Sequence, residues 1–159
     1  MKSILLYNWE VRDEYFKILS SLSLEELQKD RGAGLGSIFK TLVHIIDVEI
    51  SYIRAISNKP DIEIDVGSIE DLNAIIELSN QLRNEIKEYI NDWNNEIDNQ
   101  LITPSWMTET FSKSEIIRHL LIHEIHHIGQ LSIWTRELGI TPVSANFIRR
   151  DIFNKLKEL

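Results

Sequence analysis

Cysteine is absent from this 159-residue sequence. Its absence excludes disulfides, zinc–thiolate sites and a cysteine nucleophile, and it leaves His, Asp, Glu and water as the available metal ligands. A chain without cysteine is also compatible with a reducing compartment. We therefore expect a cytoplasmic location.

Clustered positive charge and long apolar runs are missing as well. The formal net charge is −8, from 17 Lys and Arg against 25 Asp and Glu, whereas a groove that follows phosphates needs grouped basic residues. Arg149, Arg150, Lys155 and Lys157 come nearest, and such residues in a final helix usually favour its dipole. The N-terminus meets charge by Glu10, too early for a signal peptide or a membrane span. The sequence therefore predicts no nucleic-acid partner and no membrane partner.

The remaining composition is typical of a globular protein, with 43% hydrophobic and 26% charged residues. A chain of this length can bury roughly two-thirds of its unfolded surface without disulfides or metals. No internal repeat or low-complexity segment divides it. We predict a single domain over residues 1–159.

Apolar residues recur at three- and four-residue spacings in four long segments, which predicts four amphipathic helices. These segments cover residues 3–22, 37–58, 68–96 and 112–139. Short helices are expected from Ser23 and before Leu159, and residues 97–111 are expected to be irregular, forming a short hairpin or a lid. Because the connections are mostly loops, the predicted fold is all-α, an up-and-down four-helix bundle.

Local signals define the predicted helix ends. Ser112 and Glu115 have the spacing of a capping box, and Gly139 predicts a left-handed C-terminal stop. Ser37 and Ser68 are the expected caps of two other helices. The string RGAGLGS that ends at Ser37 lacks the preceding strand of a dinucleotide fingerprint, so we interpret it as a tight loop.

Four of the five histidines lie in the segment 112–139. Helical geometry places His119, His123 and His127 in one row, because positions four apart are separated by roughly 40° around the axis. The same face carries Ile116, Leu120, Gln130, Leu131 and Trp134. A buried row of unpaired imidazoles costs on the order of 1–3 kcal/mol per group. The pattern therefore favours a metal site.

The expected ligands are His44, His123 and His127. His123 and His127 lie one helical turn apart and can bind one ion, and His44 is the only histidine available from another helix. His119 with His123 is an alternative pair, but His119 lies a further turn back and is expected to line the pocket or support a ligand. His126 lies near the edge of the face, so solvent or a helix neighbour is its expected partner.

Two other interpretations use the same residues. His123-Glu124-x-x-His127 matches the H-E-x-x-H string of zinc proteases, with Glu124 as general base, but no histidine follows His127 as a further ligand. A di-iron carboxylate site would need a second Glu-x-x-His motif, and no other Glu has a histidine three residues on. Trp106 and Trp134 either line the pocket or belong to the core.

The strings LLIHEIHHIGQL, GLGSIFKTLVHIID, LLYNW and LGITPVSANFI occur in this order along nearly the whole chain. Together they resemble the DinB-like (DinB/YfiT-like) superfamily, found in bacteria. The resemblance implies a four-helix bundle in which His44, His123 and His127 hold a divalent metal with an open coordination position. It also implies dimers built through helices and, for some relatives, transferase or isomerase activity that depends on a low-molecular-weight thiol.

The expected function is thus that of a metal-dependent enzyme acting on a small-molecule substrate. Coordination to a divalent ion, zinc or nickel above all, would lower the pKa of a water or a thiol co-substrate, and the thiolate would attack a small electrophile. Glu124, Asp47 and Gln130 are the candidates for supporting the ligands or the bound species. The alternatives are a non-enzymatic, stress-associated metal-binding protein and a small metal-dependent hydrolase that uses Glu124.

Overall fold

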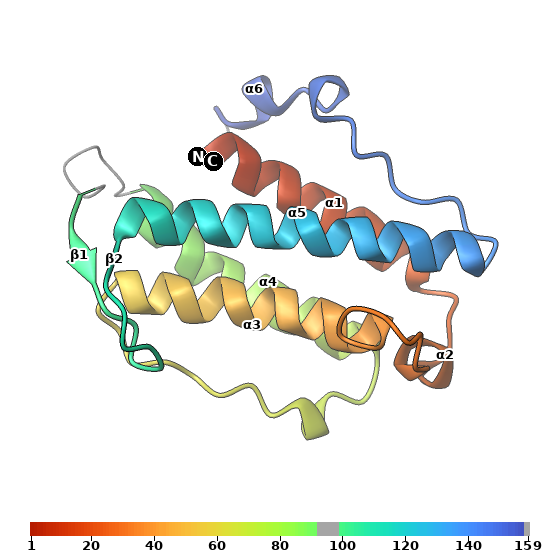
Figure 1. Cartoon of the computed structure of the whole chain (residues 1–159). Coiled ribbons are helices and arrows are strands. Elements are labelled where there is room, and N and C mark those ends of the chain that lie inside the picture. Colours follow the sequence, from red (N-terminus) through yellow and green to blue (C-terminus); the bar gives the residue numbers. More distant parts are fainter. Residues whose placement is uncertain (92–98, 158–159) are drawn as a thin grey trace. The chain divides into compact units, whose positions relative to one another are not determined.

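The computed structural model describes residues 1–91 and 99–157, and its ordered elements are mainly helices (Figure 1). In these residues the order is α1 (Lys2–Leu19), α2 (Leu24–Gln28), α3 (Ile38–Ile56), η1 (Val66–Ser68), α4 (Leu72–Asn91), β1 (Leu101–Ile102), β2 (Phe111–Ser112), α5 (Lys113–Glu137), η2 (Phe147–Arg149) and α6 (Ile152–Lys155). The predicted all-α class is confirmed. The predicted stretch of the third long helix up to residue 96 and the last residues of the final helix lie outside the described residues.

The chain forms two compact units. The first contains residues 1–41 and 123–159, and the second contains residues 42–122. The helices α3 and α5 each run continuously from one set of residues into the other. A single domain over residues 1–159 stays a prediction.

In the first unit, α1 presents a buried stripe at alternating spacings of four and three residues. Leu5, Trp9, Phe16 and Leu19 are apolar members of this stripe, and each is at most 4% exposed. This spacing is that of one face of an α-helix, so burial of the face stabilises α1. Arg12 occupies the central position of the stripe and is 1% exposed.

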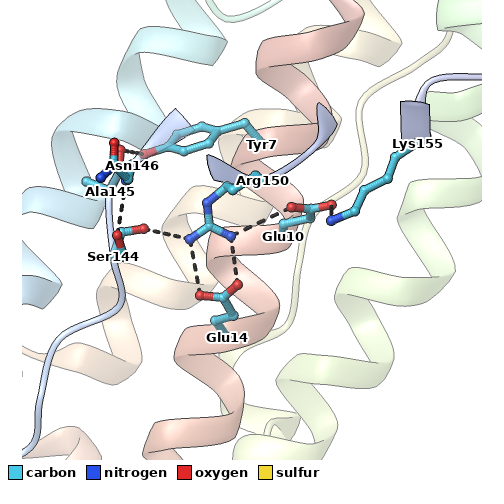
Figure 2. Close-up of polar contacts among 8 residues, drawn as sticks. All are labelled: Tyr7, Glu10, Glu14, Ser144, Ala145, Asn146, Arg150 and Lys155. Carbon is cyan, nitrogen blue, oxygen red and sulfur yellow. Dashed lines mark hydrogen bonds and ion pairs between the residues drawn. The ribbon is translucent and has the colours of Figure 1, made fainter. Parts of the chain in front are cut away.

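The C-terminal segment is fastened to α1 by charged side chains (Figure 2). The Arg150 guanidinium donates two hydrogen bonds to the Glu14 carboxylate, at 2.7 and 3.1 Å, and a third to the Ser144 carbonyl at 2.6 Å. It also lies 3.7 Å from Glu10. The Lys155 ammonium donates to Glu10 at 2.6 Å. These contacts hold the segment that contains α6 against α1.

In the second unit, the N-terminus of α4 differs from the prediction. The Asp71 carboxylate accepts a hydrogen bond from the Ala74 amide at 2.8 Å, so Asp71 caps the helix. Ser68, the expected cap, belongs to the 3₁₀ turn η1, where its hydroxyl donates to the Asp65 carbonyl. The prediction was wrong because both residue types satisfy the same capping preference and the preceding turn uses Ser68 first.

Of the two alternatives expected before the histidine-rich helix, a short hairpin or a lid, the structure has a hairpin. β1 pairs antiparallel with β2, with Leu101 opposite Ser112 and Ile102 opposite Phe111. The Lys113 amide also donates to the Gln100 carbonyl at 2.8 Å. The hairpin therefore leads the chain directly into α5.

Both predicted ends of α5 are confirmed in their chemistry. The Ser112 amide donates to the Glu115 carboxylate at 2.8 Å, and the Glu115 amide donates to the Ser112 hydroxyl at 3.3 Å, which is a capping box. At the other end Gly139 has φ +72°, and the amides of Gly139 and Ile140 donate to the carbonyls of Arg136 and Thr135. This is a Schellman motif, which requires a residue that adopts positive φ without strain.

No helix in the described residues is long and apolar enough to cross a bilayer.

Candidate metal centre

His123 and His127 face each other along α5. Their Nε2 atoms lie 3.1 Å apart, and their rings meet edge to face with centroids separated by 4.4 Å. Two imidazole nitrogens bound tetrahedrally to one ion, with bonds of about 2.0–2.1 Å, would be separated by about 3.3 Å. The observed separation therefore suits two ligands of the same ion.

The other ring nitrogen of His127 is held by Gln130. His127 Nδ1 lies 2.9 Å from Gln130 Oε1, and Gln130 Nε2 lies 3.2 Å from His126 Nε2. An amide oxygen only accepts hydrogen bonds, so Nδ1 of His127 carries the proton and its Nε2 keeps a lone pair. The amide thereby selects the tautomer whose lone pair points toward His123, an arrangement typical of metal-binding histidines.

His127 is buried, with 6% of its surface exposed. Burial lowers the pKa of this imidazole because it disfavours the charged form; the hydrogen bond that His127 donates to Gln130 raises the pKa, and the charge of His126 lowers it further. The net direction favours neutral imidazole, which is the form that binds metals.

His44 of α3 completes a group that can hold a metal ion. One ring nitrogen from each of His44, His123 and His127 lies within 4.8 Å of the others. His44 and His123 are half-buried and His127 is buried. Three imidazoles are a common ligand set of catalytic divalent metals, so the donor chemistry fits the ion that the sequence pattern indicates.

Glu124, which the sequence suggests as a support for the ligands, forms an ion pair with Arg12, and its supporting role stays a prediction. Both of its carboxylate oxygens accept from the Arg12 guanidinium, at 2.8 and 2.7 Å. The two side chains are 1% and 4% exposed, for Arg12 and Glu124 respectively. Glu124 therefore belongs to a buried bidentate ion pair, which argues against its acting as the free general base of a hydrolase.

The sequence analysis missed Arg12, although a signal was present. Leu5, Trp9, Phe16 and Leu19 define the apolar stripe of α1, and Arg12 is the one charged residue at a stripe position. A long charged residue at such a position is rarely fully buried unless it is paired. This pattern alone predicts an anionic partner for Arg12 in the core.

His119 does not belong to a buried row. It is exposed, and its ring meets the Tyr52 ring edge to face at 5.4 Å. Trp106, itself 42% exposed, packs against the same Tyr52 ring at 5.4 Å. The expectation of three buried histidines was wrong: of the three, His127 is buried, His123 is half-buried, and His119 is exposed beside the Tyr52 ring. Trp134, in contrast, is a core residue with 3% exposure.

The remaining candidates lie as follows. His126 is exposed and contacts its helix neighbour Gln130, as predicted. Asp47 lies three residues after His44 on α3, which places the two on adjacent positions of one helix face. Asp47 is half-buried, and burial raises the pKa of its carboxyl, with a smaller contribution from the charge of Asp61. A supporting role for Asp47 stays a prediction.

Three comparisons show which known proteins this chain resembles. The model of the DinB family matches residues 1–153. An uncharacterized protein of Bacillus subtilis (strain 168), YizA, is 46% identical over 147 residues, which are 92% of each chain. The crystal structure of a DinB-like protein from Bacillus cereus ATCC 10987 superposes with a TM-score of 0.68 at 18% identity, covering 89% of this chain and 95% of the other.

Proposed function

The chain belongs to the DinB family, and from this premise we propose that it is a metal-dependent enzyme in which His44, His123 and His127 hold one divalent ion. The reaction that we propose is transfer of a low-molecular-weight thiol to a small electrophile. A cytoplasmic setting, where such thiols are kept reduced, is part of the proposal.

The convergence of three ring nitrogens within 4.8 Å is the observation that carries this proposal. Imidazole suits zinc, nickel, copper and iron, and among these we propose zinc or nickel. The ligands His44 and His123 are only half-buried. Partial exposure of two ligands supports access of a small molecule to the ion, which catalysis requires.

A divalent ion at this position would lower the pKa of a coordinated thiol from its ordinary value of about 8.5. In the proposed reaction the sulfur forms a bond to an electrophilic carbon, the leaving group departs with its bonding electrons, and the thiol proton passes to solvent. His127 is held in the ligand tautomer by Gln130. Glu124 is engaged by Arg12, so the proposal assigns it no proton transfer.

Elemental analysis of untagged protein tests the metal site. We expect about one divalent ion per chain in the wild type and loss of this ion in His44→Ala and His127→Ala. The matched control is His126→Ala, which removes an exposed histidine from the same helix and should leave the metal content unchanged. Metal retained without His44 would contradict the three-ligand site, and wild-type protein that stays metal-free after reconstitution would refute metal binding.

Thiol dependence tests the reaction. We expect turnover of at least one electrophile in a panel only when a small thiol is added, and no turnover with the His127→Ala variant. Cobalt-substituted protein separates the enzyme from a non-enzymatic metal-binding protein, since an accessible ion changes its visible spectrum on addition of azide or thiol. An unchanged spectrum together with absent turnover would support a purely structural metal.

A further inference from the structure

We propose that the glycine loop of residues 31–36 is a positioning element for the metal ligand His127, acting through the side chain of Gln130. This inference rests on the proposed metal site and assigns a role to a loop that otherwise only joins α2 to α3.

The loop is closed by its own hydrogen bonds. The Arg31 amide donates to the Gly36 carbonyl at 2.7 Å, and the Gly36 amide donates to the Ala33 carbonyl at 2.9 Å. The Asp30 carboxylate accepts from the Gly32 amide at 2.9 Å. The Arg31 side chain is 8% exposed, and its guanidinium donates to the Glu26 carboxylate at 2.8 Å. A loop with these constraints presents a fixed backbone surface.

Gly34 brings that surface against Gln130. A Cβ atom at Gly34 would lie 2.7 Å from Oε1, 2.9 Å from Cδ and 3.1 Å from Nε2 of Gln130. All three atoms of the carboxamide group thus pack on the Gly34 backbone, closer than any side chain at position 34 would permit. The φ of +55° at Gly34 is a second reason for glycine, but the contact is specific to this position.

The amide group that packs on Gly34 is the same group that holds His127. Gln130 Oε1 lies 2.9 Å from His127 Nδ1, and Gln130 Nε2 lies 3.2 Å from His126 Nε2. A free glutamine side chain has three rotatable torsions, and its terminal torsion is broad. Packing on the loop removes this freedom, so Gly34 fixes the amide and the amide fixes the ring of the ligand.

Two glycine variants separate this role from the general cost of changing a loop glycine. Gly34→Ala and Gly32→Ala both place a side chain at positive φ, +55° and +65°, but a Cβ at Gly32 meets no atom within 4 Å. We expect Gly34→Ala to weaken zinc binding by about ten-fold or more, the range for substitutions that support a ligand. Gly32→Ala should bind zinc as the wild type does. Competition with a chromophoric chelator measures both affinities.

A double variant tests the route through Gln130. If the loop acts through the amide, then Gly34→Ala adds no further loss of zinc affinity to a Gln130→Ala protein, because the loop then has no amide left to position. Equal affinities of Gly34→Ala and Gly32→Ala, or fully additive losses in the double variant, would overturn the inference. Circular dichroism and thermal unfolding of each variant establish that it is folded.

A second readout does not depend on the metal. In metal-free protein, two-bond ¹H–¹⁵N spectra report which nitrogen of His127 carries the proton. We expect the Nδ1–H tautomer in the wild type and in Gly32→Ala, and a mixture of tautomers in Gly34→Ala. A wild type that binds no zinc would refute the proposed function, and these spectra would still decide the coupling of loop to ring. Unchanged spectra in Gly34→Ala would refute that coupling.

Discussion

A buried ion pair between Arg12 and Glu124 argues against a catalytic role for the glutamate in the H-E-x-x-H string of α5. A general base needs a carboxylate oxygen that faces water and a reacting group. Both oxygens of Glu124 instead accept from the guanidinium of a residue 112 positions earlier in the chain. The string therefore matches the zinc-protease pattern in its letters while its acidic residue serves the packing of α5 against α1.

The stability of the protein should depend strongly on this pair. We expect Arg12→Ala to lower the free energy of unfolding by about 3–5 kcal/mol, because it leaves the Glu124 charge buried without its guanidinium. Urea unfolding of the metal-free protein measures the change. The matched control is Arg12→Met combined with Glu124→Met, which removes both charges and should restore most of the stability. A loss below about 1 kcal/mol in Arg12→Ala would contradict this account.

At the residue scale, the sequence predicted contacts whose partners are neighbours on one helix. The one-turn spacing of His123 and His127, and the contact of His126 with a helix neighbour, follow from helical geometry alone. The sequence did not predict that Glu124 pairs with Arg12, because Arg12 lies on another helix, α1. The contact between the rings of His119 and Tyr52 was not predicted either, since Tyr52 lies on α3.

At the scale of elements, capping signals predicted a helix end correctly where a single residue of a capping type was available. Ser112 and Glu115 form the predicted box, and Gly139 ends α5 as predicted. At α4 two capping residues lie three positions apart, and the sequence does not reveal that the first, Ser68, is used by a 3₁₀ turn. Helix ends are thus predictable only when the turn before them is also known.

The start of α4 provides a direct test of this point. We expect Asp71→Ala to lower the free energy of unfolding by about 1 kcal/mol, because the Ala74 amide loses its side-chain acceptor. Ser68→Ala should change it by less than about 0.5 kcal/mol, since the Ser68 hydroxyl is exposed and makes one local bond. Urea unfolding of the two variants side by side checks the order. A larger effect for Ser68→Ala than for Asp71→Ala would indicate that Ser68 caps the helix, as predicted from the sequence.

The attachment of the C-terminal segment to α1 should depend on Arg150 in particular rather than on the number of basic residues in the segment. Arg150 donates three hydrogen bonds to Glu14 and Ser144 (Figure 2). Its side chain is 8% exposed. We expect Arg150→Ala to lower the free energy of unfolding by about 1.5–3 kcal/mol, the range for hydrogen bonds to charged groups. Arg150→Lys should recover little of this stability, because an ammonium cannot form the two-pronged contact with a carboxylate.

Arg149→Ala is the control for this prediction, since Arg149 is exposed and immediately precedes Arg150. Limited proteolysis adds a local readout: the Arg150→Ala protein should be cut within residues 140–157 faster than the Arg149→Ala protein. Equal cleavage rates and equal unfolding free energies would show that Arg150 does not anchor the segment.

At the scale of the whole molecule, family membership was predictable because its signals are spread along the chain in a fixed order. The match to the DinB family over residues 1–153 confirms that prediction. Function was less predictable, because a ligand set of three imidazoles serves several metals and several reactions. The residues that narrow the chemistry, such as Arg12 beside Glu124, act through long-range pairing; the stripe of α1 predicts a buried partner for Arg12 but does not identify Glu124 as that partner.

The oligomeric state is a property of the whole molecule for which we propose a homodimer formed through α5. Ile122, Ile125 and Ile133 are 65%, 42% and 57% exposed. Together with Gly129 they fall within an arc of about 80° on the helix. Exposed large apolar residues that share one helix face are typical of an association surface. A glycine among them lets a second helix approach closely, since a Cβ at Gly129 would meet no atom within 4 Å.

Light scattering coupled to size-exclusion chromatography tests the dimer. We expect twice the chain mass for the wild type and the mass of one chain for Ile125→Glu and Ile133→Glu, because a buried carboxylate without a partner disfavours association. Ile148→Glu is the control, since Ile148 is 86% exposed on the C-terminal segment and lies outside α5. A wild type with the mass of one chain, or α5 variants that keep twice that mass, would refute the interface. If Ile148→Glu alone dissociates the dimer, the interface lies on the C-terminal segment and not on α5.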